Sequence, residues 1–279
     1  MTETSPVLVL GGTGKTGRRV AARLAARGLP VRLGSRAGAL PFDWTDRATW
    51  PAALAGVRSV YLSYQPDLAV PGAVPAVDAF TRLAVAGGVD RVVLLSGRGE
   101  AEAEQAEQAV RKVLDDAGGT WTVVRASWFQ QNFSEGDLTD AVRSGTVALP
   151  IGDVPEPFVD VDDIADIAVA ALTAEGHAGE VYEVTGPRLL TFADAIAEIA
   201  QASGRPIRFV PVDPAEYADA LRGAGVPAET VALLAYLFGT VLDGRNASLT
   251  DGVRRALGRD PADFSGYARA AAATSVWAV

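Results

Sequence analysis

The stretch that decides the fold is Val7-Leu8-Val9-Leu10-Gly11-Gly12-Thr13-Gly14-Lys15-Thr16-Gly17-Arg18-Arg19-Val20. Its apolar run, glycines and amphipathic continuation predict a buried strand, a tight turn and the start of a helix. Gly11 permits a sharp turn, Gly14 lets backbone N–H groups approach a pyrophosphate, and Gly17 lets the helix pack close to the strand. A diphosphate then lies at the positive end of the helix. The stretch predicts a dinucleotide site, the alternative being a glycine-rich turn without a ligand.

Composition narrows the class of protein. A chain of 279 residues that is 49% hydrophobic can bury the core of one or two domains. A net charge of −9 argues against a nucleic-acid partner, which needs a basic face. The absence of cysteine excludes disulfides and thiolate metal sites. The single histidine, His177, lies in a glycine-flanked stretch that is typical of a solvated loop, so we expect no metal site.

The N-terminal residues and the longest apolar run indicate where in the cell the protein is expected. Residues 1–5 lack the basic region and apolar core of a signal peptide. The longest apolar run, residues 231–238, is too short to span a membrane. We therefore expect a cytoplasmic protein with a small-molecule substrate and no membrane partner, and the sequence is compatible with a homo-oligomer.

Strand-like runs alternate with helical patterns in the first half, as in a parallel sheet covered by helices. We expect an α/β fold, a doubly wound parallel sheet of the Rossmann type, followed by a smaller, mostly helical capping region. Strands are expected at Val7–Leu10, Val31–Gly34, 60–63, 92–95 and 121–125. Helices are expected at 14–27, 47–55, 74–86 and 101–116.

The pattern changes in the second half. Asp162 is expected to cap one helix and Thr191 to cap another over 192–202. Residues 1–132 are expected to form the NADP-binding domain and 133–279 the capping region, with 160–185 rejoining the sheet. Short strands are expected at 147–149, 157–159, 181–184 and 207–210. Further helices are expected at 214–222, 227–242, 250–257 and 261–272.

The end of the second strand indicates which dinucleotide binds. NAD enzymes place an acidic residue there to hold the ribose hydroxyls, whereas this chain has Leu33-Gly34-Ser35-Arg36. Arg36 and Ser35 can hold a 2′-phosphate, and Lys15 can add a second positive charge, which favours NADPH. Asp43 follows the next short strand and is expected to reach the adenine. The alternatives are that Arg36 is a solvated turn residue and that Asp43 caps the following helix. The residues expected at the cofactor are Gly11, Thr13, Gly14, Lys15, Thr16, Gly17, Ser35, Arg36, Asp43, Trp44, Ser63 and Ser96.

The usual proton-donating pair of short-chain dehydrogenases, Tyr-x-x-x-Lys, is absent, since the lysines are Lys15 and Lys112 and neither follows a tyrosine at that spacing. The helix that would present the pair carries four glutamates instead. We interpret these as a solvated face, the alternative being that one or two lie near the nicotinamide and favour a cationic substrate. Ser96 occupies the position of the superfamily's catalytic serine and either binds the substrate or caps a strand end. The four glutamates are Glu100, Glu102, Glu104 and Glu107.

Several motifs together resemble the NmrA-like group of atypical short-chain dehydrogenase/reductases, in particular the festuclavine and agroclavine dehydrogenases of ergot alkaloid biosynthesis. The similarity extends over nearly the whole chain. Its motifs are Gly-Lys-Thr in the first turn, Leu33-Gly34-Ser35-Arg36, Phe42-Asp43-Trp44, Val60-Tyr61-Leu62, Val92-Val93-Leu94-Leu95-Ser96, Arg125-Ala126-Ser127-Trp128-Phe129-Gln130-Gln131-Asn132-Phe133-Ser134-Glu135, Pro157-Phe158-Val159-Asp160-Val161-Asp162-Asp163-Ile164-Ala165 and Gly186-Pro187-Arg188-Leu189-Leu190-Thr191.

The resemblance implies reduction of an imine or iminium by NADPH. A C=N⁺ group already carries its charge, so no enzyme group has to deliver a proton. Other members of the group reduce quinones or bind the dinucleotide as redox sensors without turnover, and both functions remain alternatives. For Trp128, Phe129 and also Phe133, the alternative is plain core packing. The residues expected to line the substrate pocket are Tyr64, Gln65, Ser96, Arg98, Trp128 and Phe129.

Overall fold

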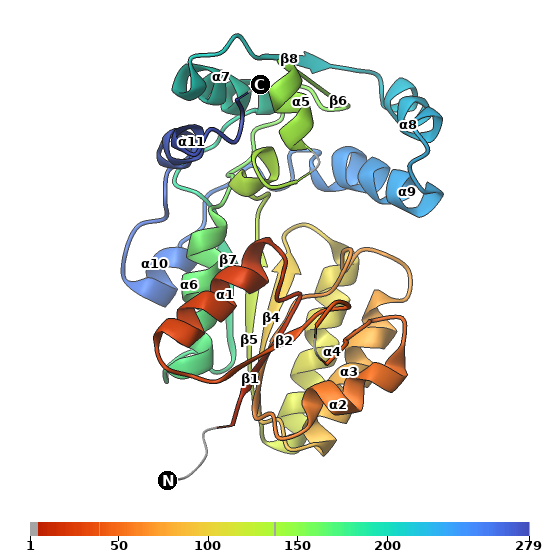
Figure 1. Cartoon of the computed structure of the whole chain (residues 1–279), viewed down its shortest axis with the longest axis vertical. Helices are drawn as coiled ribbons and strands as arrows, with labels where there is room; N and C mark the ends of the chain where they lie inside the picture. Colours follow the sequence, from red (N-terminus) through yellow and green to blue (C-terminus); the bar gives the residue numbers. More distant parts are fainter. Residues whose placement is uncertain (1–4, 39, 137, 279) are drawn as a thin grey trace. The chain divides into compact units, whose positions relative to one another are not determined.

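The computed structural model describes residues 5–38, 40–136 and 138–278, which form two compact units (Figure 1). The first, here called the sheet unit, comprises the chain up to Ala126 with Asp162–Val184 and Gly252–Arg259. The second, here called the aromatic unit, comprises Ser127–Val161, Thr185–Asp251 and the chain from Asp260 onward. The chain thus leaves the sheet unit after Ala126, earlier than the expected boundary at 132, and returns to it twice.

The sheet unit is built on a six-stranded parallel sheet with the order β2-β1-β3-β4-β5-β7. The chain passes from β1 outward to β2 and then crosses back to β3, so β1 and β3 form the switch point of a doubly wound sheet. This confirms the predicted fold class. The strands are β1 (Val7–Leu10), β2 (Val31–Gly34), β3 (Ser59–Leu62), β4 (Arg91–Gly97), β5 (Thr120–Ala126) and β7 (Glu180–Val184).

Helices cover both faces of this sheet. In Figure 1, α1 (Lys15–Ala26), α6 (Val161–Thr173) and α10 (Gly252–Leu257) lie on one face. On the other face lie α2 (Trp50–Leu54), α3 (Ala73–Ala86) and α4 (Ala101–Ala117). The inner strands β1, β3 and β4 are therefore largely buried on both faces, which explains their nearly continuous apolar runs.

Asp162 does not cap α6, because this helix begins one residue earlier, at Val161. The Asp162 carboxylate instead lies in the first turn and accepts a hydrogen bond from Arg23 of α1 at 2.6 Å. Arg23 also donates to Asp166 at 2.7 Å, so an ion-pair ladder joins the two helices on this face. The acidic residue was correctly placed at the start of the helix, but its partner lies on another helix.

The aromatic unit combines helices with a two-stranded parallel sheet, β6 (Thr146–Leu149) and β8 (Arg208–Pro211). Thr191 caps α7 (Phe192–Ser203), as predicted, and the structure adds a reciprocal hydrogen bond from Asp194 that completes a capping box. The strand expected at 157–159 is reduced to an isolated bridge between Phe129 and Val159. Its other helices are α5 (Leu138–Ser144), α8 (Pro214–Gly223), α9 (Ala228–Tyr236) and α11 (Phe264–Ala273).

Two helices of the aromatic unit differ from the expected ranges. The helix expected over 227–242 is α9 followed by a π-helical turn, Leu237–Val241. The helix expected from residue 261 begins at Phe264, because the Asp263 carboxylate accepts a hydrogen bond from the Ser265 N–H and caps it. Within the described residues, no helix combines the length and the apolar character that a membrane span requires.

Candidate active site

The glycine loop between β1 and α1 has the shape that its sequence predicts. Gly11 has a φ of +63°, in the region that favours glycine. A Cβ on Gly17 would lie 2.1 Å from the Gly11 carbonyl oxygen, so only glycine lets the helix approach this closely. A Cβ on Gly14 would lie 3.2 Å from that same oxygen and would fill the loop.

The N-terminus of α1 suits an anion. Its N-cap residue, Gly14, provides no side-chain hydrogen bond, and its first turn contains no acidic residue. Backbone N–H groups at such a helix start bind phosphate well. Lys15 is the first residue of the helix and is half-buried, Thr13 is exposed, and Thr16 is buried.

The end of β3 lies against the glycine loop. The Ser63 hydroxyl oxygen is 3.4 Å from where a Cβ of Gly11 would be, and the Gln65 amide nitrogen is 3.5 Å from that of Gly14. This is the switch point between β1 and β3, where doubly wound sheets bind ligands. The structure therefore brings Ser63 and Gln65 together with the predicted cofactor loop.

At the end of β2, Arg36 is exposed and Ser35 is half-buried, and no carboxylate follows the strand directly. Asp43 accepts hydrogen bonds from the backbone N–H and the hydroxyl of Thr45, at 2.8 and 2.7 Å. These bonds, and to a smaller extent the charge of Arg36, hold the pKa of Asp43 below its usual range. The cap of the next helical turn is Asp46, not Asp43, since Asp46 accepts from the Ala48 N–H.

Trp44 and Tyr64, predicted for the cofactor and for the substrate, contact each other. Their ring centroids are 4.7 Å apart, and Trp44 also packs edge-on against Phe42 and Phe80. Both rings are half-buried. Tyr64, two residues after the end of β3, and Trp44 thus form one aromatic cluster, here called the aromatic wall.

Ser96 belongs to a buried polar network rather than to a strand end. It lies within β4, and its hydroxyl donates to Glu107 of α4 at 2.7 Å. Arg125 of β5 donates to both carboxylate oxygens of Glu107, at 2.9 and 2.6 Å, and Arg111 adds a contact at 3.2 Å. The hydroxyl proton of Ser96 is thus directed to Glu107.

Glu100, which precedes α4, and the three glutamates within α4 do not form one solvated face, so that interpretation was wrong for two of the four. Glu107 is 1% exposed and Glu100 is 8% exposed. Burial of Glu107 is tolerated because two arginines and a hydroxyl satisfy its oxygens. Glu104 is exposed and Glu102 half-buried.

Glu100 has another acid as its partner. Its carboxyl is hydrogen-bonded to that of Asp67, which follows β3, and lies directly on Gly97 at the end of β4. Burial, with the neighbouring charge of Asp67, raises the pKa of Glu100 to about 9, and burial also raises the pKa of Asp67. Two carboxyls that share one proton leave a single negative charge at this edge of the sheet. Sequence reasoning missed Asp67, whose only signal was its place shortly after a strand.

Arg98, expected in the substrate pocket, is buried and forms an ion pair. Its Nε donates to Glu183 Oε1 of β7 at 2.5 Å, and its backbone N–H donates to the Ala126 carbonyl. The ion pair with Glu183 connects the loop after β4 to β7, the strand at the edge of the sheet.

In the aromatic unit, Trp128 is half-buried, with ring centroids 5.9 Å from Phe192 and 5.5 Å from Phe238. Phe129 is half-buried and bridges to Val159. Phe133 is fully buried among aromatic rings, so the core-packing interpretation holds for it.

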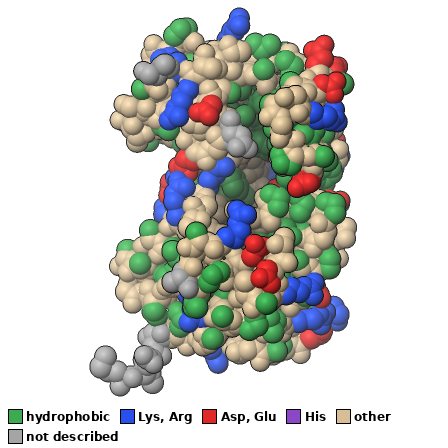
Figure 2. Space-filling view, turned by 45° about the vertical axis from the view of Figure 1, so that its right-hand side comes forward, with side chains coloured by type: hydrophobic (Ala, Val, Ile, Leu, Met, Phe, Trp, Pro, Cys, Tyr) green, Lys and Arg blue, Asp and Glu red, His purple; other side chains and the backbone are tan. Residues whose placement is uncertain are grey.

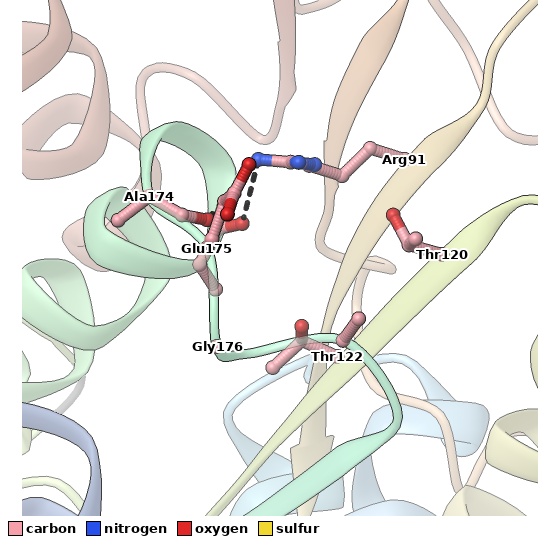
Figure 3. Close-up of a pocket in the computed structure, with 8 residues that line it drawn as sticks. Arg91, Thr120, Thr122, Ala174, Glu175 and Gly176 are labelled. Atoms are coloured by element: carbon pink, nitrogen blue, oxygen red, sulfur yellow. Dashed lines mark hydrogen bonds between the residues drawn. The ribbon is translucent and has the colours of Figure 1, made fainter.

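A separate cavity of about 190 Å³ lies at the opposite edge of the sheet, where β4 and β5 begin (Figure 3). Arg91 reaches across it and donates to the carbonyls of Leu172 and Ala174, at 3.1 and 3.4 Å. These carbonyls end α6, so Arg91 has a capping role there. None of the predicted site residues lines this cavity.

Charge on the drawn face of the molecule is mixed (Figure 2). Lys and Arg side chains occur in small groups among acidic and hydrophobic ones, without a continuous basic surface on that face. This agrees with the net charge of −9.

Comparison with known proteins identifies the family. No protein-family model matches the chain. The chain is 33% identical to the uncharacterized oxidoreductase YesF of Bacillus subtilis over 99% of both chains. It is 32% identical to agroclavine dehydrogenase of Claviceps fusiformis, covering 94% of this chain and 95% of that one. It is 30% identical to an NAD(P)H azoreductase of Xenophilus azovorans, covering 96% and 98%.

Solved structures agree on the fold. Triphenylmethane reductase of Citrobacter, complexed with NADP(H), superposes with a TM-score of 0.73 at 19% identity over 95% of this chain and 99% of that one. The NADPH-dependent quinone oxidoreductase QOR2 of Escherichia coli gives 0.72 at 22% identity over 94% and 98%. With its glycine loop, its doubly wound sheet and relatives above 30% identity along nearly its whole length, the chain belongs to the NmrA-like atypical short-chain dehydrogenase/reductases, a family of oxidoreductases.

Proposed function

We propose that the protein is an NADPH-dependent reductase that acts on an imine, an iminium or a similar conjugated small molecule without a Tyr-Lys pair. The observation that carries this proposal is the glycine loop, with the side chains after β3 against it and Arg36 in place of an acid after β2. When bound, NADPH supplies a hydride. The relatives named as dehydrogenases and reductases support the reaction class.

The residues present fit NADPH. The backbone of residues 14–17 would hold the diphosphate at the start of α1, where no acidic side chain competes. Arg36 and Ser35 would hold the 2′-phosphate, and Lys15 would add charge. The aromatic wall of Trp44 and Tyr64 begins beside this loop and would exclude water from it.

The charges near the strand ends favour a cationic acceptor. Asp67 and Glu100 together retain one negative charge at the carboxyl ends of β3 and β4. An iminium at this edge would be attracted, and its reduction needs no proton from the enzyme. Ser96 would then orient the strand through Glu107 and would not act as an acid.

The Asp67–Glu100 pair also supports a second candidate function, the reduction of quinones or azo compounds. These acceptors need a proton as well as a hydride. Because the raised pKa of Glu100 keeps the pair protonated near pH 7, it offers a proton source that the missing tyrosine does not. The similarity to an azoreductase supports this candidate.

The test is a screen of NADPH oxidation by the purified protein. The acceptors are a permanently charged N-alkyl iminium, neutral cyclic imines, an azo dye and a quinone. We expect turnover with the iminium at a rate independent of pH from about 6 to 9, since neither partner has to deliver a proton. Turnover only with the quinone or the azo dye, falling as pH approaches 9, would favour the second candidate. NADPH binding without turnover of any acceptor would contradict both and favour a redox sensor.

A further inference from the structure

The cavity at the amino ends of β4 and β5 is lined only by residues of the sheet unit, at the edge opposite the glycine loop (Figure 3). Its volume of about 190 Å³ is smaller than the roughly 300–1,000 Å³ of most small-molecule sites, so it suits a ligand of a few heavy atoms. Its lining combines one arginine, two threonines and one glutamate with the methyl groups of Ala171, Ala174 and Ala178. Charged and apolar surfaces therefore meet in one small space.

The loop that follows α6 forms one wall of this cavity and is fixed to β5. The Thr122 hydroxyl donates a hydrogen bond to the His177 carbonyl at 2.7 Å, and the Gly179 N–H donates to the Trp121 carbonyl at 2.8 Å. Thr122 is itself buried. Because these bonds preform the wall, binding would require little ordering of the loop.

Arg91 extends across the cavity and uses one of its three side-chain nitrogens within the protein. Nη1 donates to the carbonyls of Ala171, Leu172 and Ala174 around the end of α6, at 3.5, 3.1 and 3.4 Å. In the part of the chain that the structure describes, Nε and Nη2 have no hydrogen-bond partner, and no carboxylate forms an ion pair with Arg91. Nε and Nη2 present parallel N–H groups on one side of the guanidinium, an arrangement that matches both oxygens of a carboxylate.

Arg32 shows that an arginine at a helix end does not by itself indicate a ligand. Its Nη1 donates to the carbonyls of Ala53 and Ala55 at the end of α2, at 2.8 and 2.6 Å, and it too forms no ion pair with a described carboxylate. Arg32 does not line the cavity, however. Arg91 differs because its guanidinium forms part of a small preformed space that also has apolar walls.

We propose that this cavity binds a small aliphatic carboxylate, with its two oxygens on Nε and Nη2 of Arg91 and its chain against the three alanines. The ligand supplies the counter-charge that Arg91 does not receive from the described residues, and it matches the paired N–H groups. Glu175 also lines the cavity, and its negative charge opposes a dianion more than a monoanion. The site therefore favours a monocarboxylate over phosphate. This inference goes beyond the proposed function, because it requires neither the cofactor nor turnover.

The test compares butyrate with butyramide, its uncharged analogue, in NMR titrations of ¹⁵N-labelled full-length protein near neutral pH and at constant ionic strength. Two hydrogen bonds to a charged group correspond to a dissociation constant of about 1 mM, which we expect for butyrate. Butyrate should shift the backbone amide resonances of residues 174–179 in a saturable way. Butyramide and inorganic phosphate should bind at least about tenfold more weakly.

Arg91→Lys keeps the positive charge and a donor for the α6 carbonyls but loses the paired N–H groups, so it should weaken butyrate binding by about tenfold. The matched control is Arg32→Lys, the same change at another helix end, which should leave butyrate affinity within about twofold. Glu175→Gln should strengthen butyrate binding by about two- to fivefold, and phosphate binding by more.

The wild-type comparison decides the proposal even if a variant is unstable. Equal shifts with butyrate and butyramide, butyrate shifts that do not saturate, or shifts confined to residues outside the cavity would overturn it. So would a butyrate affinity that Arg91→Lys leaves unchanged, or that Arg32→Lys lowers as much. Failure of the proposed function would appear instead as an absence of NADPH turnover in the acceptor screen, which these titrations do not involve.

Discussion

Glu107 and Glu100 are both buried carboxyls, one within α4 and one immediately before it, yet their surroundings are opposite. Glu107 faces Arg125, Arg111 and the Ser96 hydroxyl. Glu100 faces Asp67, another acid. Burial alone therefore does not decide whether a carboxyl is charged. The partner matters as well, since the same stretch of chain contains one glutamate held by two arginines and another that is hydrogen-bonded to an aspartate.

The largest effect should come from removing Glu107, the glutamate that two arginines hold. Glu107→Ala leaves Arg125 without its carboxylate and Ser96 without an acceptor, so we expect unfolding free energy to fall by about 3–5 kcal/mol. Denaturant unfolding measures the change. Glu104→Ala, at an exposed position of the same helix, is the control and should change stability by less than about 0.5 kcal/mol. If both variants unfold alike, the network around Glu107 contributes little.

A smaller, pH-dependent effect should come from Glu100. The pKa of Glu100 is raised to about 9 in the folded protein from 4.5 otherwise, so the folded state binds more protons between these values. Stability should therefore fall as pH rises from 4.5 toward 9. Glu100→Gln keeps a donor for Asp67 and carries no charge, so it should remove most of this decline. We expect it to exceed the wild type by about 1–3 kcal/mol at pH 8.5.

Thermal unfolding from pH 5 to 9 measures this difference. At pH 5 the two proteins should have similar Tm values, and the gap should widen with pH. A gap that stays constant with pH, or a Glu100→Gln variant less stable than the wild type at high pH, would show that Glu100 is ionised in the folded state.

An effect of similar size should come from Ser96→Ala. It removes one hydrogen bond to a charged group, worth about 1.5–3 kcal/mol of stability, while both arginines continue to hold Glu107. Because the hydroxyl proton points to Glu107, turnover should fall by less than about tenfold. Single-turnover rates with saturating NADPH provide the measurement, and a thousandfold loss with cofactor binding unchanged would identify Ser96 as a catalytic residue.

Whether a feature can be predicted from the sequence depends on how close together along the chain its interacting residues lie. The β1–glycine–α1 unit, the strands of the large sheet and the Thr191 cap follow from residues within a few positions of one another, and these were predicted. The partners of Glu107 and Glu100 were not predicted. Arg125 lies 18 residues from Glu107 on a neighbouring strand, and Asp67 comes from a different loop than Glu100, so neither pairing leaves a periodic pattern.

Asp162 illustrates the same limit. An aspartate before an apolar helical pattern is a typical cap, but the partner that fixes its position is Arg23, 139 residues away.

The measurement that tests the central claim most directly compares NADPH and NADH binding by the wild type and by Arg36→Ala. One charge-assisted phosphate contact is worth about 1.5–3 kcal/mol, so the wild type should prefer NADPH, and the variant should lose about tenfold to a hundredfold of that preference. Affinity for NADH should change little, since Arg36 would face only the 2′-phosphate. Equal dissociation constants of the wild type for the two cofactors, or an unchanged preference in Arg36→Ala, would contradict the assignment of this edge of the sheet as an NADPH site.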